Sequence, residues 1–388
     1  MKILIANATL ASRTGTETYV RDLAIGLLRR GHEPLVYAPE VGEIADELRL
    51  AAIPVVDDLH NLAATPDLIH GNHNTELMTA LLHFPRVPAV FVCHSSLDWN
   101  SAPPVHPRIR AYAAVDDACR DRLAIEHAIS AEHVRVMLHG IDQERFKPRA
   151  PLPDRPRRAL VFSNNANAFT HLPHVEKACK RAGIALDVVG SASKASNSRP
   201  EDLLGDYDLV FAKARCALES LVVGTAVILC DSYGSGPLVT TGELERLRRL
   251  NFGIRTLCKR TNADVLLREI ERYDANDATE VSRRIRPAAD ISLVIDEMVA
   301  VYKDVIRDYQ NSEPPDATEE ARAAAEYLRW LTFVTRQNKD NYEGMFASSR
   351  TLQFRHALGR LPLFDRSLKR LGDMIRGRDR GSTNNGQP

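Results

Sequence analysis

Short apolar runs that alternate with helical patterns constrain this chain more than any other feature of its sequence. In the first half, five runs have the length and apolar content of buried strands, with helical or loop segments between them. These runs are residues 2–7, 34–39, 67–71, 89–95 and 134–140. Strands that alternate with helices indicate parallel βαβ units. Because the runs lack clean polar alternation, we expect a sheet that is covered on both faces.

The same pattern restarts after residues 142–158, a segment rich in proline and charge that is typical of a linker. Four further strand runs follow, at residues 159–165, 185–190, 208–212 and 226–231. Beyond them, helices are expected over 290–308 and 318–336, separated by NSEPPDATEE. The sequence therefore predicts an α/β fold with two Rossmann-like, doubly wound parallel-sheet domains and a C-terminal helical extension.

Composition argues against several classes of protein. The 51 Lys and Arg balance the 51 Asp and Glu, and the excess of acidic residues before residue 350 argues against nucleic-acid binding. No run approaches the roughly 18 apolar residues of a membrane-spanning helix, and MKILIANATL is typical of a core strand rather than a signal peptide. Six scattered cysteines without a CxxC pair favour a reducing, cytoplasmic setting.

In open parallel sheets, ligands bind beyond the carboxyl ends of the strands, so the loops there are candidate sites. The loop SRTGTE (12–17) follows the first strand and opens a helix. Gly15 allows a ligand to approach the backbone, and the helix N-terminus offers free N–H groups to an anion. The loop matches neither GxGxxG nor a P-loop, so a plain strand-to-helix turn is the alternative.

Histidines end two of the predicted strands. His94 closes the run AVFVCHS, where an imidazole can contact sugar hydroxyls or share a proton near neutral pH. A histidine that only caps the strand end is the alternative. His70 and His73 end another strand, but no carboxylate or cysteine stands at ligand spacing, so no metal site is expected.

Glu219 stands in KARCALESLVVGTAVILCD, where a helix is expected to begin. The helix dipole stabilises a carboxylate at that end by about 0.3–1 kcal/mol, which accounts for the residue without a ligand. A carboxylate can also hold two adjacent hydroxyls of a ribose, and Lys213 and Arg215 beside the helix end can meet a diphosphate. SYGSGP, with Gly234 and Gly236, is predicted to be a loop whose backbone amides serve the same ligand.

Five segments together resemble the GT-B glycosyltransferases, in particular the large retaining class called family 4. They are TGTETYVRDLAIGLLRRGHE, DLIHGNHN, AVFVCHS, HGIDQERFKP and DLVFAKARCALESLVVGTAVILCD. The first resembles a GGxE-type loop and helix, the fourth resembles NG-[VI]-D-x-x-x-F-x-P, and the last resembles the family's donor-site block. The resemblance covers roughly residues 1–308, with the segments in the family's order and spacing.

The resemblance implies two domains that face each other across a cleft. The first, residues 1–148, would bind mainly the acceptor, and the second, 149–288, would bind a nucleoside diphosphate sugar. A helix in 289–310 would cross back to the first domain, and 311–388 would be a helical extension. Transfer would proceed with retention and without metal, with the donor as co-substrate and no further cofactor.

Site residues are carried over by position in these motifs. Glu219 would hold the ribose and His94 would lie near the reacting sugar, so these two are the predicted catalytic residues. The predicted donor-binding residues are Ser163, Asn164, Lys213, Arg215, Glu219, Gly234 and Gly236. The predicted residues on the acceptor side of the cleft are Gly15, Thr16, Glu17 and His94.

The chain departs from the family pattern in three places. In the E-x7-E motif, Phe211 stands where the first glutamate is usual. Residues 163–165 read Ser-Asn-Asn where a glycine, an arginine and, a little later, a lysine are usual, and a single glycine, Gly15, replaces two in the first loop. Lys213 and Arg215 are therefore expected to compensate for the displaced cations.

The C-terminal segment has a pattern of its own. Apolar residues recur at helical spacing in 364–376, and residues 350–388 hold nine Lys or Arg against three Asp or Glu. A basic amphipathic helix of this kind can lie on an anionic membrane surface, here the inner face. It can equally pack its apolar stripe on the protein or on a partner, and the sequence leaves both open.

Together these features predict a cytoplasmic glycosyltransferase of the kind that works in polysaccharide biosynthesis. It would transfer a sugar to a hydroxyl of a glycan, a lipid-linked saccharide or a small-molecule secondary metabolite. Two alternatives stay open. One is a GT-B nucleotide-sugar 2-epimerase, and the other is a catalytically degenerate GT-B domain that binds a glycan or a partner without turnover.

Overall fold

The structure is a computed structural model that describes residues 1–190 and 199–348, with side chains described up to residue 340. Its contacts define one compact unit over Met1–Ala323 and a second unit that begins at Ala324. Both sheets belong to the first unit. The basic segment predicted at 364–376 lies outside the described residues.

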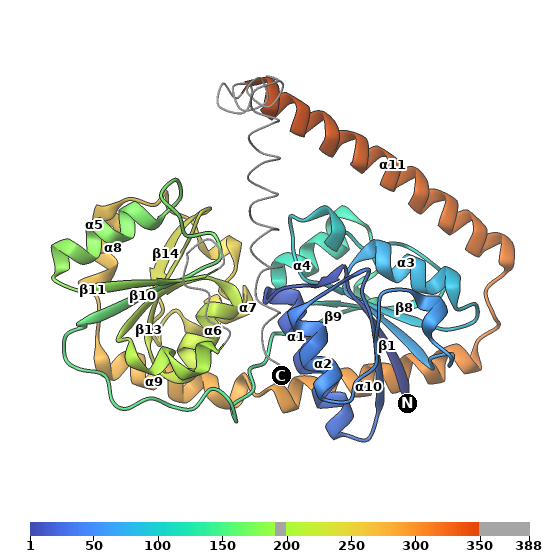
Figure 1. The fold of residues 1–388 in the computed structure, drawn as a ribbon, viewed down its shortest axis with the longest axis horizontal. Coiled ribbons are helices and arrows are strands. Elements are labelled where there is room, and N and C mark those ends of the chain that lie inside the picture. Colours follow the sequence, from blue (N-terminus) through green and yellow to red (C-terminus); the bar gives the residue numbers. More distant parts are fainter. Residues whose placement is uncertain (191–198, 349–388) are drawn as a thin grey trace, which may run out of the picture. The chain divides into compact units, whose positions relative to one another are not determined.

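A seven-stranded sheet organises the first part of the chain (Figure 1), in the order β5-β3-β1-β6-β7-β8-β9. Its strands are β1 Lys2–Ala6, β3 Glu33–Tyr37, β5 Val55–Val56, β6 Leu68–Gly71, β7 Ala89–Cys93, β8 Ile109–Ala114 and β9 Val134–Val136. All neighbouring pairs are parallel. A separate parallel pair joins β2, Thr9–Leu10, to β4, Glu40–Val41.

Helices connect the strands of this sheet. They are α1 Gly15–Arg29, α2 Glu43–Leu50, α3 Asn74–His83 and α4 Asp117–Asp121. Helix α1 buries Tyr19, Val20, Leu23 and Leu27, the apolar stripe expected from its sequence. The chain leaves α1 through Gly31, whose φ of +73° lies in the left-handed region that glycine adopts at low cost.

A five-stranded sheet organises the second part, in the order β11-β10-β12-β13-β14. Its strands are β10 Arg158–Phe162, β11 Ala185–Val189, β12 Leu209–Ala212, β13 Ala226–Asp231 and β14 Gly234–Leu238, of which only β14 runs antiparallel to its neighbour. Its helices are α5 Leu172–Ala182, α6 Ala214–Val223, α7 Leu244–Arg249, α8 Ala263–Ile270 and α9 Ala275–Ala288.

Helix α10, Ile291–Asn311, returns from α9 to the first sheet and packs against α1, β7 and β8 (Figure 1). Gly26 of α1 makes this approach possible, because a Cβ there would lie 2.0 Å from Cδ1 of Ile295. Farther along α10, the buried Tyr302 hydroxyl lies 2.7 Å from His70 Nδ1. Helix α11, Ala317–Ser348, follows.

Each of the nine predicted apolar runs contains a strand, so the predicted α/β class with parallel sheets is confirmed. Strand β8 was not predicted, because IRAYAA is rich in alanine and carries an arginine instead of large apolar residues. Helix α11 begins within one residue of its predicted start but extends well beyond residue 336.

The prediction of a ligand loop at SYGSGP is wrong, since Gly234 and Gly236 lie in the edge strand β14. A Cβ on Gly236 would lie 2.5 Å from the carbonyl oxygen of Thr256, and Gly234 has a φ of +152°. Ser235 between them exchanges backbone hydrogen bonds with Lys259. The glycines therefore allow close packing of two backbone segments, and a ligand is not needed to account for them.

The contact between α10 and the first sheet can be tested with Tyr302→Phe. The change leaves His70 Nδ1 buried without its hydrogen bond, so we expect the free energy of unfolding to fall by about 1–3 kcal/mol. Urea denaturation measures this. Tyr309→Phe, a partly buried tyrosine on the same helix, is the matched control and should change stability far less. Equal effects of the two variants would contradict this role of the Tyr302 hydroxyl.

Candidate active site

Each sheet has a point at which its strand order reverses. The reversal lies between β1 and β6 in the first sheet and between β10 and β12 in the second. Loops on either side of such a point run to opposite faces of the sheet and open a crevice at the carboxyl ends of the strands. The loops that leave β1, β10 and β12, together with the helices that follow them, carry most of the site residues that the sequence predicts.

A cavity of about 200 Å³, here called the central cavity, lies where loops from the two sheets meet. Four predicted site residues line it: Gly15 from the start of α1, Asn164 after β10, and Arg215 and Glu219 from α6. Residues separated by some two hundred positions in the sequence are therefore brought together as predicted.

Gly15 has no packing role among the described residues, because a Cβ at this position would meet none of their atoms within 4 Å. The absence of a side chain leaves the backbone at the start of α1 open toward the central cavity. Gly190, which the sequence did not single out, lines the opposite wall and is required for packing. Its φ is +155°, and a Cβ would lie 2.1 Å from the carbonyl oxygen of Ser163.

Arg215 is the centre of a buried charge network that joins α6 to α1. Its Nε donates a hydrogen bond to Glu219 Oε1 at 2.9 Å, and its Nη2 donates one to Asp22 Oδ2. The exposed fractions of Arg215, Glu219 and Asp22 are 7%, 5% and 8%. Burial raises the pKa of Glu219, and the guanidinium of Arg215 opposes that shift. The charge of Arg215 is therefore shared between two carboxylates.

The expected position of Glu219 at the start of its helix is wrong. Helix α6 begins at Ala214, immediately after Lys213, so Glu219 is its sixth residue. The dipole effect fades beyond the first turn, and the carboxylate is stabilised instead by Arg215. Among residues 1–190 and 199–348, nothing donates a hydrogen bond to Glu219 Oε2. This oxygen is therefore available to a ligand hydroxyl in the central cavity.

Other predicted donor residues do not line the central cavity. Lys213 lies 3.4 Å from Asp231 Oδ2, and its ammonium lies 5.1 Å from the centre of the Tyr233 ring. Ser163 is buried, and its hydroxyl accepts a hydrogen bond from the backbone N–H of Asn165. These contacts hold the loops that follow β10 and β13.

On the first-domain side, Thr16 and Glu17 also lie outside the lining of the central cavity. Glu17 is almost fully buried, and its carboxylate accepts hydrogen bonds from the hydroxyls of Thr14 and Thr16. This arrangement stabilises the first turn of α1, where a carboxylate also interacts favourably with the helix dipole.

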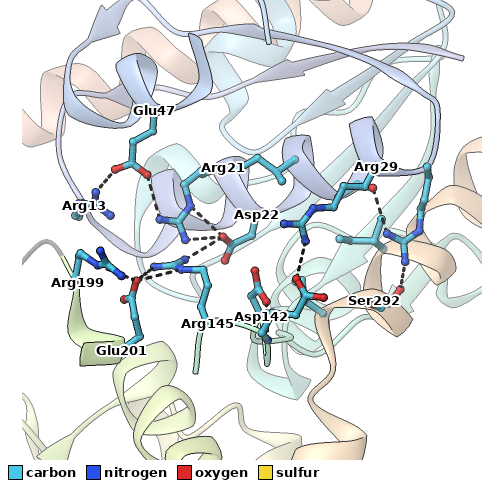
Figure 2. A pocket seen from close by; sticks show the side chains of 16 residues that line it. Arg13, Arg21, Asp22, Arg29, Glu47, Asp142, Arg145, Arg199, Glu201 and Ser292 are labelled. Carbon is cyan, nitrogen blue, oxygen red and sulfur yellow. Dashed lines mark hydrogen bonds and ion pairs between the residues drawn. The ribbon is translucent and has the colours of Figure 1, made fainter. Parts of the chain in front are cut away.

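A larger pocket of about 430 Å³ shares Arg13, Arg21 and Arg145 with the central cavity (Figure 2). Its charged side chains come from Arg13, α1, α2, the linker and residues 199–201, and α10 contributes Ile291, Ser292 and Ile295. Glu47 lies between Arg13 and Arg21, and Glu201 faces Arg145 (Figure 2). Because these arginines are matched by carboxylates, the pocket offers little net charge to an anion.

Phe211, at the position of the usual first glutamate, is fully buried in β12 and packs in the core beneath α5 and α8. Phe211 therefore belongs to the core and does not line the central cavity.

His94 belongs to a hydrogen-bonded cluster in the first domain. Asn72 Oδ1 lies 2.8 Å from His94 Nε2 and 3.1 Å from His70 Nε2. An amide oxygen only accepts hydrogen bonds, so both Nε2 atoms carry protons. The Tyr302 hydroxyl then donates to His70 Nδ1, and His94 Nδ1 is left as an acceptor. His94 packs edge-on against Tyr19 and does not line the central cavity.

Burial keeps the histidines of this region neutral. It lowers the pKa of His70 to about 4 and that of His139 to about 3, and it holds the pKa of His94 well below its usual range. At neutral pH these side chains therefore act as neutral hydrogen-bonding groups and not as cations.

Comparisons with known proteins agree with the fold. A family model described as Glycosyltransferase Family 4 matches residues 13–145, and no curated protein sequence matches the chain. Among solved structures, a glycosyltransferase from Rickettsia africae is similar with a TM-score of 0.56 at 13% identity, over 80% of this chain and 99% of that one. Anabaena Alr3699/HepE in complex with UDP-glucose is similar with a TM-score of 0.58 at 16% identity, over 78% of this chain and 100% of that one.

The fold is that of the GT-B glycosyltransferases. The resemblance noted in the sequence is thus confirmed for the fold, and the match to the family 4 model places it in the first domain. Sucrose-phosphate synthase from Thermosynechococcus elongatus is also similar, with a TM-score of 0.51 at 12% identity, over 79% of this chain and 99% of that one.

The described residues contain neither a metal-binding cluster nor a helix suited to crossing a membrane. Within the residues that the structure describes, no three His, Cys, Asp or Glu side chains are grouped so that they could hold a metal ion. None of the described helices combines the length and the apolar character that crossing a membrane requires.

The buried histidines predict acid sensitivity. The unfolded chain binds these protons with pKa values near 6.5, whereas burial lowers the pKa of folded His70 to about 4. The unfolded state therefore takes up more protons as pH falls through this window, and stability present above pH 6.5 is lost toward pH 4. We expect a loss of about 1.4 kcal/mol per pH unit for each such histidine.

Urea denaturation between pH 7.5 and 4.5 measures this dependence. His70→Gln should reduce the slope, whereas His60→Gln, whose imidazole is 81% exposed, should leave it unaltered. Stability that does not vary with pH over this range would contradict the assignment.

Proposed function

We propose that the protein is a glycosyltransferase that uses a nucleoside diphosphate sugar as its donor. The observation that carries this proposal is the central cavity, in which the open backbone at Gly15 faces Arg215 and Glu219 from the second sheet. A cavity at the carboxyl edges of two doubly wound sheets is where such folds bind nucleotides. In this proposal residues 1–148 form the acceptor side and 149–288 the donor side.

Glu219 is assigned to the ribose of the donor. Its Oε1 is held by Arg215, so the carboxylate has a fixed orientation, and Oε2 can accept a hydroxyl hydrogen bond. Burial raises the pKa of Glu219 and the guanidinium of Arg215 opposes this shift, which favours the ionised form that accepts the stronger hydrogen bond. Arg215 therefore serves first to position Glu219 and second to offer its remaining N–H groups to the donor.

The chemistry is assigned as transfer to a hydroxyl with retention and without a metal ion or further cofactor. Preorganised N–H groups that stabilise the departing diphosphate would supply most of the rate enhancement. His94, neutral and with Nδ1 as an acceptor, is assigned to a hydroxyl of the reacting sugar. The similar structure of Anabaena HepE contains UDP-glucose, which supports a nucleotide sugar as donor.

A glycan, a lipid-linked saccharide or a small molecule remains the predicted acceptor class, and cytoplasmic location with membrane contact through 364–376 stays a prediction. A second candidate function follows from the charge pairing of Lys213 and Arg215 with Asp231, Asp22 and Glu219. If these pairs persist in the presence of a donor, the fold acts as a glycan- or partner-binding module without turnover.

The proposal can be tested with a panel of nucleoside diphosphate sugars, with released nucleoside diphosphate as the measured product. We expect release from at least one donor. Glu219→Gln should lower kcat/KM about 100-fold, which corresponds to about 2.7 kcal/mol of transition-state stabilisation. Glu176→Gln, at an exposed position of α5, is the charge-matched control and should retain full activity.

The products of this assay distinguish the candidate functions. Interconversion of the sugar on the nucleotide identifies a 2-epimerase. Glycan binding without release from any donor identifies a binding module, and either result would overturn the assignment as a transferase.

A further inference from the structure

Arg248, in α7, is a buried guanidinium that lacks a carboxylate partner. Its side chain is 7% exposed, and no Asp or Glu in the described part of the chain lies within 4.0 Å of its nitrogens. Its Nη2 donates to the carbonyl oxygen of His139 at 2.5 Å and its Nη1 to Asn251 Oδ1 at 3.4 Å, while Nε is buried and finds no partner within residues 1–190 and 199–340. Burial lowers the pKa of Arg248 to about 10. An unmatched buried cation is costly unless an anion compensates it.

The same contacts fix the protonation of His139. Arginine only donates hydrogen bonds, so Asn251 turns its oxygen toward Arg248 and its Nδ2 toward His139 Nδ1, at 3.2 Å. Because Nδ1 then accepts, the proton of the neutral imidazole lies on Nε2. The side chain is 9% exposed, and Nε2 is buried without a partner among the described residues. His139 therefore presents a second unused donor.

Arg215 supplies a third N–H donor without a partner among the described residues. Its Nε and Nη2 bind Glu219 and Asp22, but Nη1 is buried and has no partner in residues 1–190 and 199–348. Arg248 bonds to the carbonyl oxygen of His139, and the His139 ring stacks on Tyr19 of α1, one helical turn from the Asp22 that binds Arg215. The positive charges of Arg215 and Arg248 also lower the pKa of His139. The three side chains come from α6, α7 and the loop after β9, and Arg215 also lines the central cavity.

The backbone segments at the start of α6 and just after α7 are joined by a hydrogen bond, and both contain residues in an unfavourable conformation. Ala214, Asn251 and Phe252 have φ values of +52°, +48° and +52°, a region that costs non-glycine residues about 1 kcal/mol or more each. The N–H of Ala214 donates to the carbonyl oxygen of Phe252 at 2.9 Å, which links the start of α6 to the end of α7. This link keeps Arg215 beside Asn251 and Arg248.

Charge and donor geometry define the ligand. Asp22 and Glu219 are balanced by Arg21 and Arg215, so Arg248 leaves one positive charge in excess. Arg248 Nε, Arg215 Nη1 and His139 Nε2 are three N–H donors that lack an acceptor among the described residues. A phosphate group offers several oxygens and a negative charge to such a set. The loop 163–171 after β10 reads SNNANAFTH and contains no Lys or Arg, so it offers no cation for the same purpose.

We propose that Arg248, Arg215 and His139 together bind the diphosphate of the donor. This inference rests on the proposed function and names the groups that meet the charge of the leaving group. Arg248 supplies the uncompensated positive charge, and Arg215 Nη1 and His139 Nε2 donate hydrogen bonds to the diphosphate oxygens.

The experiment measures the binding of inorganic diphosphate and of a set of nucleoside diphosphates to the full chain by isothermal titration calorimetry. Arg248→Gln should weaken both by about tenfold or more, equivalent to about 1.4 kcal/mol. Arg246→Gln removes the same charge from an exposed position of α7, where Arg246 pairs only with Glu243, and should bind like the wild type. Arg248→Lys keeps the charge but has fewer N–H donors, so its diphosphate affinity should fall by less than that of Arg248→Gln. This variant tests the proposal if Arg248→Gln fails to fold.

Failure of this inference and failure of the proposed function give different results. Unchanged diphosphate affinity in both Arg248 variants, or no affinity in the wild type, overturns the diphosphate site even if a donor is turned over. Arg248-dependent diphosphate binding without turnover of any nucleotide sugar supports the site and contradicts the transferase. Where a donor is turned over, the inference further requires that Arg248→Lys raise its KM, and an unchanged KM overturns it.

Discussion

The buried pairing of Arg215 with Asp22 and Glu219 holds the site together. Asp22 comes from α1 of the first sheet, whereas Arg215 and Glu219 come from α6 of the second. A carboxylate or guanidinium left alone at this depth would be strongly destabilising, so each partner requires the others. The network therefore joins α1 to α6 and orients the glutamate assigned to the ribose. In the part of the chain that the structure describes, it leaves Glu219 Oε2 and Arg215 Nη1 without a partner.

Charge matching distinguishes the parts of the region that hold the structure from the part that is proposed to bind a ligand. The arginines of the larger pocket each face a carboxylate, as Arg21 faces Glu47 and Arg145 faces Glu201. Arg248 is nearly as buried as Arg21 but, among the described residues, it contacts a carbonyl and an amide oxygen and no carboxylate. The first arrangement is complete within the protein, whereas the second is completed only by an anion.

Sequence reasoning found many parts of the site but not their relations. It identified Gly15, Asn164, Arg215 and Glu219, which do line one cavity. Sequence reasoning predicted Glu219 at the start of a helix and Gly234 and Gly236 in a ligand-binding loop. Both predictions were made because helix starts and glycine-rich loops are common at nucleotide sites. In the structure, Glu219 is instead stabilised by its ion pair with Arg215 inside α6. The two glycines allow the backbone to pack closely against residues 256–259. Asp22 and Arg248 were missed, since a charged residue on an amphipathic helix has no local pattern that distinguishes a buried contact from a solvated one.

The sequence by itself determined the two parallel sheets, their connecting helices and the loops that end at the same edge, because apolar periodicity and glycine positions act over a few residues. Only the tertiary structure decided which charges are matched, which histidine nitrogens carry protons and which donors remain unpaired. These properties depend on distances between α1, α6, α7 and the loop after β9, and on the low polarity of a buried environment. No single segment of the chain determines these distances or the polarity of the buried environment.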